Sequence, residues 1–554
     1  MEEREIEILN NNDNKDEVCQ ILQRFLKNNE NAFNFPDLAE KNQRALLWTA
    51  LFQRLQDKSS ASVHALCLAS VRVLSRDKSD LENLICERWV TTLIERAGLY
   101  NFEALDEESM MPLDLIEKDV AVEALKCLCN ITFNCEGARA LCAHTSIAQG
   151  LVARLRIYKE MPFKEEIMLF DLKLLFILTA LRHDIKTKIK DELHGMEYLI
   201  NCLGEILIEA STNVEEQASS SSTSLAEGAH HCFLQDNQQA IVCEILKTQF
   251  NLILQSGSEE PTDEEEEAMY LKLMPVLTAL LHAHTSTEMK LLELSSNIAN
   301  LLTSVPPMFY SFLTPELTAG ERAQYEYDGR NMDALQTLII LLQYKLTITT
   351  GPKTQRENLS PILTVLNKSS RGCRSQRKYL RQVVLPPLRD VSHPPEQGNH
   401  LRNQLCRLLT TPVTSVRDLV AEFLFILCKE KVGRMVKYTG FGNAAGHLAQ
   451  KGLLSGGRSG DYSSSSDDSD TEEYLEAQPN IDPVVGCTRP PRINPFEGMT
   501  DEQKEYEAMK LVTLFDKMVT DGVVKPARIG PDGRPQAVEH VLELRENLPN
   551  RPQS

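Results

Sequence analysis

The stretch at residues 120–134, VAVEALKCLCNITFN, constrains the fold more than any other part of the chain. Its apolar residues recur three and four positions apart, which places them on one buried face of a helix. These residues are Ala121, Ala124, Leu125, Leu128 and Ile131. Asn130 has counterparts in two later apolar helices, Asn251 and Asn300, at intervals of 121 and 49 residues. Because armadillo and HEAT repeats run about 40–47 residues, this spacing predicts an all-α, armadillo/HEAT-like helical-repeat solenoid with 120–134 as an inner helix.

The length of the chain supports the same architecture. A chain of 554 residues is too long for one compact core, whereas each repeat of a solenoid packs only on its neighbours. Aromatic residues make up 6% of the chain and hydrophobic residues 42%, which suits helices packed through aliphatic side chains. We expect the solenoid to span 1–455, with a Ser-rich insertion at 218–228 and a solvated acidic loop at 256–267.

The net charge and the cysteine usage disfavour some classes of function and indicate the cellular compartment. The net charge of −20 disfavours nucleic-acid binding, because a polyanion would be repelled. The 14 Cys residues lie mostly in apolar helical runs without any CxxC, and the acidic N-terminus has no apolar stretch of the signal-peptide kind. No apolar run approaches the roughly 18 residues of a membrane span. The sequence therefore predicts a soluble cytosolic protein with reduced thiols and no integral membrane segment.

Motifs for covalent chemistry are absent from the sequence. It holds no GxxxxGK[ST], no GxSxG and no HExxH, and the glycines of 440–446 have GxGxxxG spacing after a helix. The histidines at 230–231 and 282–284 have no partners at zinc-site spacing, so ordinary surface histidines are the better interpretation. Cys127 and Cys129 point to different sides of one helix and are interpreted as core residues. We therefore expect no enzyme activity, no metal and no cofactor, and a function that comes from binding.

Two sets of polar residues are candidates for that binding. Arg72 and Arg76 lie one turn apart on a helix predicted for 62–77, either on a solvated charged edge or as donors on the concave surface of the solenoid. Lys126 and Asn130 are i,i+4 neighbours on the polar side of the inner helix at 120–134.

The C-terminal region changes in composition. The segment 456–495 is rich in Ser, acidic residues and then Pro, and we predict a disordered acidic linker. An amphipathic helix follows at 496–520, with a capping box formed by Thr500 and Gln503. A lone helix beyond a linker is marginal by itself, so it should dock on a partner or on the solenoid. We expect a flexible tail at 521–554.

One basic segment stands out in this acidic chain. Between 368 and 389 seven basic residues occur without any acid: Lys368, Arg371, Arg374, Arg377, Lys378, Arg381 and Arg389.

Several stretches together resemble the synembryn family of chaperones and non-receptor exchange factors for heterotrimeric G-protein α subunits. They are SVRVLSRD (70–77), ALKCLCN (124–130), FDLKLLFILTALR (170–182), VLPPLRDV (384–391), VAEFLFILCKE (420–430), KYTGFGNAAG (437–446) and EGMTDEQKEYEAMKLVTLFDK (497–517). The set occurs in family order over nearly the whole chain. The chain departs from the pattern near 220, at 306–330 and after about 520.

The resemblance implies how such a protein works. The concave face of the solenoid holds the C-terminal helix of a monomeric α subunit, promotes GDP release and stabilises the nucleotide-free state until GTP binds. Arg72, Arg76 and Asn130 match the family positions that contact this helix, and Lys126 is a further candidate one turn away. The resemblance also implies a cytoplasmic protein recruited to the cell cortex, and a monomer is expected for a capped solenoid.

The resemblance assigns roles to the C-terminal region as well. The helix at 500–519 would hold the switch region of the α subunit through Met509, Val512 and Phe515. Ser464 and Ser469 each have an acid three residues on, which suits an acidophilic kinase of the casein-kinase-2 type. The phosphates would dock on the basic residues Arg377, Lys378 and Arg381, whereas the simpler interpretation is a solvated acidic linker.

A second class of function stays open. A solenoid can also act as a scaffold or transport adaptor that binds an extended peptide and has no exchange activity. An importin-like reader would need a ladder of Trp and Asn on successive inner helices, and the isolated Trp48 and Trp89 argue against it.

Overall fold

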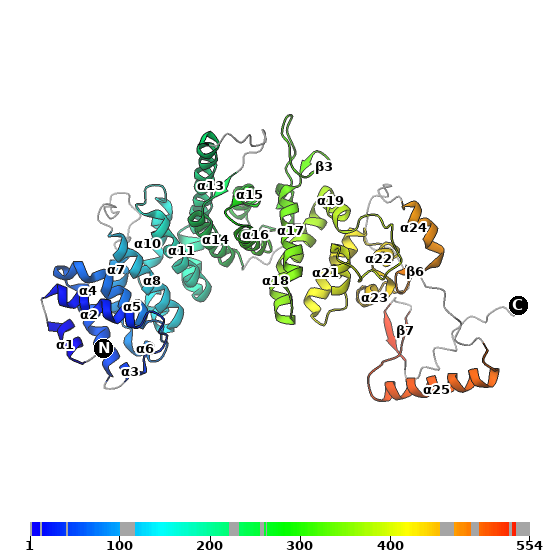
Figure 1. The fold of residues 1–554 in the computed structure, drawn as a ribbon. Coiled ribbons are helices and arrows are strands. Elements are labelled where there is room, and N and C mark those ends of the chain that lie inside the picture. The colour runs from blue at the N-terminus through cyan, green and yellow to red at the C-terminus, as the bar shows by residue number, and fades with distance from the viewer. Residues whose placement is uncertain are drawn as a thin grey trace. The chain divides into compact units, whose positions relative to one another are not determined.

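The computed structural model describes residues 3–11, 14–39, 42–99, 117–220, 232–254, 260–261, 263–454, 470–488, 498–530 and 534–538. The chain divides into two compact units, Met1–Gln324 and Tyr325–Ser554. Helices dominate the described part of both units, and its strands form four two-stranded sheets of two or three residues per strand. The predicted all-α helical-repeat solenoid is confirmed (Figure 1).

Helices of the first unit form two rows. The outer row consists of α1 (Glu3–Asn11), α4 (Gln43–Gln56), α7 (Glu87–Arg96), α10 (Ile147–Arg156), α13 (Gly195–Ser220) and α15 (Glu264–Leu281). The inner row consists of α2 (Lys15–Asn28), α5 (His64–Leu74), α8 (Lys118–Asn134), α11 (Lys164–Leu181), α14 (Asp236–Ile253) and α16 (Glu288–Leu302). Each inner helix packs against its outer partner and against the inner helices before and after it.

Short elements connect the two rows. They are α3 (Pro36–Ala39), α6 (Leu81–Leu84), α9 (Glu136–Ala143), α12 (His183–Thr187), the 3-10 helices η2 (Lys58–Val63) and η6 (Pro307–Leu313), and the π-helix η5 (Lys188–Glu192). Strand β1 (Phe233–Leu234) pairs in parallel with β2 (His284–Thr285) and ties two of the connections together.

Apolar side chains between the rows form the core. The five apolar positions predicted for α8 are all at most 2% exposed, so the predicted buried face is confirmed. Burying a Leu or Ile side chain contributes about 1.5–3 kcal/mol, and the repeated contacts make the stack cooperative between neighbours.

A buried ion pair fastens α10 to α11. Arg154 on α10 donates from one guanidinium nitrogen to both carboxylate oxygens of Asp171 on α11, at 2.9 and 3.0 Å, and both side chains are 3% exposed. The other terminal nitrogen of Arg154 donates to the carbonyl oxygen of Ala97. Burial raises the pKa of the Asp171 carboxyl, and the guanidinium opposes that rise. The pair is satisfied on both sides, which is the condition for keeping charges inside a core.

The second unit continues the helical pattern. Its helices are α17 (Asp333–Ile348), α18 (Pro352–Gly372), α19 (Arg374–Val384), α20 (Leu401–Leu408), α21 (Thr414–Leu427), α22 (Val432–Thr439) and α23 (Phe441–Gln450). Helix α21 lies at the centre and packs against α18, α19, α20, α22 and α23. The unit begins with an antiparallel pair, β3 (Glu326–Tyr327) and β4 (Arg330–Asn331), which starts in the segment 306–330 where the chain departs from the family pattern.

Part of the predicted disordered linker is folded. Residues 470–488 form α24 (Glu472–Ala477), the 3-10 helix η7 (Gln478–Asn480) and a hairpin of β5 (Ile481–Asp482) and β6 (Cys487–Thr488). Hairpin carbonyls of Pro483 and Val484 accept hydrogen bonds from the first two amides of α23, at 2.8 and 2.9 Å. The amide of Thr488 donates to the carbonyl of Val391 at 2.9 Å. The prediction of disorder was wrong for 470–488, because backbone hydrogen bonds that composition does not reveal hold this segment in place. The linker's other residues lie mostly outside the described ranges.

Two glycines make this contact possible. Gly440 and Gly486 have φ of +73° and +79°, the left-handed region that glycine adopts without strain. A Cβ on Gly440 would lie 2.9 Å from the carbonyl oxygen of Val485, and a Cβ on Gly486 would lie 3.0 Å from the Cα of Gly440. The hairpin therefore docks only because neither residue has a side chain.

The acidic stretch at 256–267 is not a loop throughout. Four of its glutamates, 264–267, form the first turn of α15, behind an N-cap in which Asp263 accepts a hydrogen bond from the amide of Glu266 at 2.8 Å. Acidic side chains at a helix N-terminus interact favourably with the helix dipole, which explains why this run starts a helix. The residues of the predicted loop that precede 260 lie outside the described ranges, as does most of the Ser-rich insertion.

The C-terminal region holds one long helix. Helix α25 (Asp501–Thr520) begins at the predicted capping box, in which Thr500 and Gln503 bond each other's backbone amides. A hairpin of β7 (Ala527–Ile529) and β8 (Pro535–Ala537) follows, in a region predicted to be a flexible tail. No helix among the described residues is long and apolar enough to cross a membrane.

Candidate partner-binding site

The four candidate residues of the first unit come from the adjacent inner helices α5 and α8. Helix α8 extends over the whole predicted stretch, but α5 ends at Leu74, so Arg76 is not one helical turn from Arg72 as the sequence predicted. The hydroxyl of Ser75 donates to the carbonyl of Arg72 at 2.8 Å and replaces the backbone bond that would continue the helix. The Ser75 hydroxyl therefore occupies the Arg72 carbonyl at the point where α5 ends.

A shared carboxylate links Arg72 to Lys126. Arg72 Nε donates to Glu123 Oε2 at 2.7 Å, and Lys126 Nζ donates to Glu123 Oε1 at 2.8 Å. All three side chains are partly exposed, and the group carries one net positive charge. Glu123 was not singled out from the sequence, although its i,i+3 spacing to Lys126 on a predicted helix was a usable signal.

Asn130 links α8 to α5 by two hydrogen bonds, an arrangement that we call the asparagine bracket. Its Nδ2 donates to the carbonyl of Arg72 and to the hydroxyl of Ser75, both at 3.2 Å. These bonds satisfy groups at the C-terminus of α5, which have no partner within that helix. Asn130 thus fixes the backbone from which the Arg72 side chain extends.

Arg76 lies beyond the end of α5, against the turn that follows α2. Its guanidinium donates to the carbonyl of Glu30 at 2.7 Å and lies 5.6 Å from the ring centroid of Phe33. The contact holds the cation in place by a cation–π interaction, while Phe33 itself is largely exposed.

The cluster continues onto α11. Phe170 lies between two lysines, with Lys126 Nζ at 5.1 Å and Lys173 Nζ at 4.9 Å from its ring centroid. Phe170 and Lys173 are only partly buried, although most of the stretch 170–182 is apolar. We call Arg72, Glu123, Lys126, Phe170 and Lys173 the inner-row cluster.

The α8 arrangement occurs a second time on α14. Glu244, Lys247 and Asn251 stand 121 residues after Glu123, Lys126 and Asn130. Lys247 Nζ donates to Glu244 Oε1 at 3.0 Å, and Asn251 Nδ2 donates to the carbonyl of Phe176 at 3.2 Å and to Thr179 Oγ1 at 3.1 Å. The asparagine spacing seen in the sequence therefore has a structural cause, which is the same bracket between successive inner helices.

Exposed apolar side chains lie on the same row of helices as the cluster. They stand at or beyond the C-terminal ends of α2, α8, α11 and α14 and are 46–66% exposed: Phe33, Phe133, Leu181 and Leu254. We call them the apolar edge. Lys78 Nζ lies 5.5 Å from the ring centroid of Phe133, so cations accompany this edge as well. A polar, cationic strip beside an apolar edge is the surface that an amphipathic helix fits.

Helix α25 presents a second apolar surface. Met509 is 65% and Phe515 is 38% exposed, and Val512 is partly exposed. No residue of α25 is buried, so these three predicted contact residues all stand on an accessible helix.

The predicted phosphate-docking residues line one pocket of about 200 Å³ in the second unit. Arg377, Lys378 and Arg381 on α19 share it with Tyr327 and with Tyr438 of α22. Ser464 and Ser469 lie outside the described residues. The chain becomes described again at Asp470, which pairs with Lys437, the residue before Tyr438.

Most cysteines of the solenoid are buried in its core, although Cys86 is exposed. Burial raises the pKa of the Cys67 and Cys129 thiols to about 12, and that of Cys127 rises for the same reason. Such thiols stay protonated near neutral pH and are poor nucleophiles. No three His, Cys, Asp or Glu side chains come together to hold a metal ion in the described part of the chain.

Comparison with known proteins places the chain in a family. The family model for guanine nucleotide exchange factor synembryn matches residues 67–534. This chain belongs to the synembryn family. "Chaperone Ric-8A" of Gallus gallus is 40% identical over 95% of this chain and 94% of its own length, and "Chaperone Ric-8A" of Danio rerio is 40% identical over 95% and 93%. "Chaperone Ric-8" of Drosophila melanogaster is 36% identical over 97% of this chain and 96% of its own length.

The synembryn match covers three of the surfaces described above and all of the apolar edge except Phe33. It begins within α5 and ends beyond α25, between β7 and β8. The inner-row cluster, the basic pocket at α19 and the exposed face of α25 therefore all lie inside the synembryn region, and the resemblance read from the ordered motifs is confirmed.

Proposed function

We propose that this protein is a chaperone and guanine-nucleotide exchange factor for monomeric G-protein α subunits, and that its inner row captures the C-terminal helix of its partner. The observation that carries the proposal is the inner-row cluster beside the apolar edge in a member of the synembryn family. We further propose a cytoplasmic monomer that is recruited to the cell cortex when it meets its partner.

The chemistry of the cluster suits the end of a helix. The C-terminal helix of an α subunit presents unpaired carbonyls and a terminal carboxylate. A guanidinium binds the carboxylate through two parallel hydrogen bonds and donates single hydrogen bonds to the carbonyls. Arg72 and Lys126 share only one carboxylate, so an incoming carboxylate can pair with their remaining donors. The apolar face of the same helix would lie along the apolar edge.

Asn130 and Arg76 would support this contact in different ways. Asn130 uses both amide hydrogens of Nδ2 to fix α5, so its side-chain carbonyl is the atom left for a ligand N–H. Arg76 stands beside Phe33, where its guanidinium and the ring together could bind a peptide segment.

Nucleotide exchange follows from thermodynamic linkage between binding of the partner's C-terminal helix and binding of the nucleotide. In the nucleotide-bound partner, the C-terminal helix supports the loop that holds the guanine base. An inner row that binds the detached helix more tightly than the packed one lowers nucleotide affinity, and GDP leaves. GTP restores the packed helix and expels the solenoid, because each ligand weakens the other by the same factor. A surface that stabilises the nucleotide-free state also serves as a chaperone for it.

Helix α25 would hold the partner's switch region. Met509, Val512 and Phe515 lie on its accessible face, and an isolated helix gains stability by covering that face with a partner. Replacing Met509 and Phe515 by Glu should weaken binding of the α subunit while leaving the solenoid folded, as measured by titration calorimetry.

Phosphorylation of Ser464 and Ser469 by an acidophilic kinase of the casein-kinase-2 type would fasten the linker. The cationic pocket of Arg377, Lys378 and Arg381 supports this docking, as does the pairing of Asp470 with Lys437 nearby. Phosphorylated protein with Lys378→Ala and Arg381→Ala should exchange nucleotide at the unphosphorylated rate. An unchanged response to phosphorylation in that variant would rule out the docking.

The experiment that tests the function is GDP release from a purified α subunit with and without this protein. We expect faster release, and a loss of at least about tenfold in the effect for Arg72→Glu, equivalent to about 1.4 kcal/mol. Lys353→Glu is the matched control, since Lys353 is an exposed cation outside the cluster and the reversal changes net charge equally. Binding without faster release from any α subunit would instead support a solenoid scaffold or adaptor that takes an extended peptide.

A further inference from the structure

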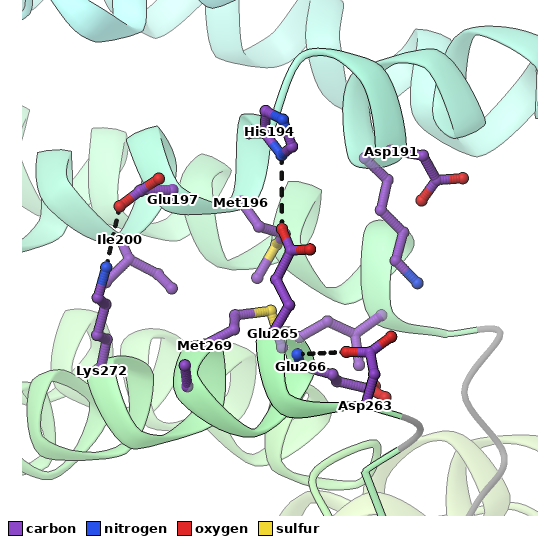
Figure 2. Close-up of a pocket in the computed structure, with 13 residues that line it drawn as sticks. Asp191, His194, Met196, Glu197, Ile200, Asp263, Glu265, Glu266, Met269 and Lys272 are labelled. Carbon is purple, nitrogen blue, oxygen red and sulfur yellow. Dashed lines mark hydrogen bonds and ion pairs between the residues drawn. The ribbon is translucent and has the colours of Figure 1, made fainter.

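We propose that a cavity between α13 and α15 is a second binding site, which takes a basic peptide segment carrying Arg or Lys beside an aliphatic residue. The cavity has a volume of about 340 Å³ and lies in the first unit, where the turn before α13 meets the beginning of α15 (Figure 2). Its residues are distinct from the inner-row cluster, so the proposal stands independently of the exchange function.

The floor of the cavity is apolar. Met196 and Ile200 of α13, Ile253 of α14 and Met269 of α15 line it, and Figure 2 shows the two methionine side chains between the helices. Methionine side chains are flexible and polarisable and adapt to aliphatic ligands of different shape.

The rim of the cavity is acidic. Five carboxylates stand against two lysines, which gives a net charge of −3 with histidine neutral; the carboxylates are Asp191, Glu197, Asp263, Glu265 and Glu266, and the lysines are Lys190 and Lys272. An anionic ligand would be repelled, and the helix N-terminus that could attract it is already capped by Asp263. The net negative charge of the lining residues therefore favours a cationic ligand.

One histidine–carboxylate contact and one weak ion pair cross the cavity and can exchange partners. His194 Nδ1 lies 3.5 Å from Glu265 Oε1, and Lys272 Nζ donates to Glu197 Oε1 at 2.9 Å, as Figure 2 shows. All four side chains are more than half exposed, so each pair contributes little to stability. A ligand guanidinium could replace the imidazole of His194 or the ammonium of Lys272 at little cost.

The turn between η5 and α13, which carries part of the acidic rim, has an unusual backbone conformation. The π-helix η5 ends at Glu192, and His194 adopts φ of +50°, which is uncommon for a residue with a side chain. A Cβ on the next residue, Gly195, would lie 2.6 Å from Ile189 Cγ2 and 3.1 Å from the Ile189 carbonyl oxygen. The turn keeps this shape through close packing, and it holds His194 and Asp191 at the mouth of the cavity.

The floor and the rim together describe one ligand class. The aliphatic stem of Arg or Lys can lie on the methionines while its charged group reaches the carboxylates. A neighbouring Leu or Ile would fill the rest of the apolar floor, because the cavity is larger than one side chain.

The experiment uses the full chain and fluorescein-labelled octapeptides with the sequence Gly-Ser-Leu-X-Leu-Ser-Gly-Gly, where X is Arg, Gln or Glu. Fluorescence anisotropy should show binding of the Arg peptide, binding at least about tenfold weaker for the Gln peptide and none for the Glu peptide. Glu265→Lys should weaken binding of the Arg peptide by about tenfold. Glu267→Lys is the matched control, since it changes the same charge on an exposed residue of the same helix turn that does not line the cavity.

A second measurement locates the ligand. The methyl resonances of Met196 and Met269 should shift on titration with the Arg peptide, while that of Met289, which is exposed on α16, should not. Equal binding of the three peptides, equal effects of Glu265→Lys and Glu267→Lys, or no binding of the Arg peptide up to about 1 mM would each overturn the proposal. So would a shift of Met289 without shifts of the two cavity methionines.

Discussion

The asparagine bracket of Asn130 predicts how much stability the variant Asn130→Ala should lose. Replacing Asn130 by Ala removes two hydrogen bonds from α8 to the end of α5, each 3.2 Å long. A hydrogen bond contributes about 0.5–1.5 kcal/mol net. The carbonyl of Arg72 keeps the hydroxyl of Ser75 as a donor, so the replacement leaves no buried group without a partner. We therefore expect a loss of about 1–2 kcal/mol, at the low end of what two bonds allow.

Asn251 supplies the matched variant for the same prediction. It makes the same two kinds of bond, at 3.2 and 3.1 Å, to a carbonyl and a hydroxyl of α11. Native-state hydrogen exchange should show faster exchange near the C-terminus of α5 in Asn130→Ala and near that of α11 in Asn251→Ala, by similar factors. Similar exchange in wild type and variant, or a loss confined to one of the two sites, would refute the repeated bracket. Only Asn130→Ala should also weaken binding of the α subunit.

Three further predictions concern single contacts. Asp171→Ala leaves Arg154 charged and buried, so it should lower the free energy of unfolding by about 3–5 kcal/mol in urea titrations, whereas Arg154→Met with Asp171→Leu should lose much less. Burial lowers the pKa of His447 to about 4, with a smaller contribution from Lys451, and Glu422 Oε2 lies 3.8 Å away. Because the unfolded chain then binds a proton that the folded chain does not, stability should fall by about 3 kcal/mol as pH drops from 6.5 to 4, and His447→Phe should remove that dependence. Gly440→Ala should release the 481–488 hairpin, giving faster proteolysis there with the rest of the chain protected; equal cleavage in wild type would contradict the docking.

The periodic parts of the fold could be predicted from the sequence. The apolar spacing of α8 fixed which face is buried, because a helix repeats every 3.6 residues whatever packs on it. The 121-residue interval between Asn130 and Asn251 spans two steps of the inner row, from α8 through α11 to α14, so it did not give the repeat length. The capping box of Thr500 and Gln503 gave the beginning of α25. In each case the information lies within a few neighbouring residues.

Contacts between distant residues could not be predicted in this way. At the end of α5, the hydroxyl of Ser75 donates to the carbonyl of Arg72 and also accepts from Asn130, 55 residues later. The folding of 470–488 depends on carbonyls of that segment meeting amides of α23. Glu123 and Phe170 join the inner-row cluster only because α5, α8 and α11 lie side by side. Such pairs have no local periodicity, so a single sequence does not reveal them.

The most direct test of the central claim is a double-mutant cycle between Arg72 and the terminal carboxylate of the partner helix. A synthetic peptide would reproduce the C-terminal helix of the partner, with either a free or an amidated C-terminus, and its dissociation constant would be measured against wild type and Arg72→Ala. A contact between the two charges predicts that each change weakens binding and that the changes are not additive, with a coupling of about 1.5–3 kcal/mol. Additive effects, or an affinity that does not depend on Arg72, would contradict capture of the helix by the inner row.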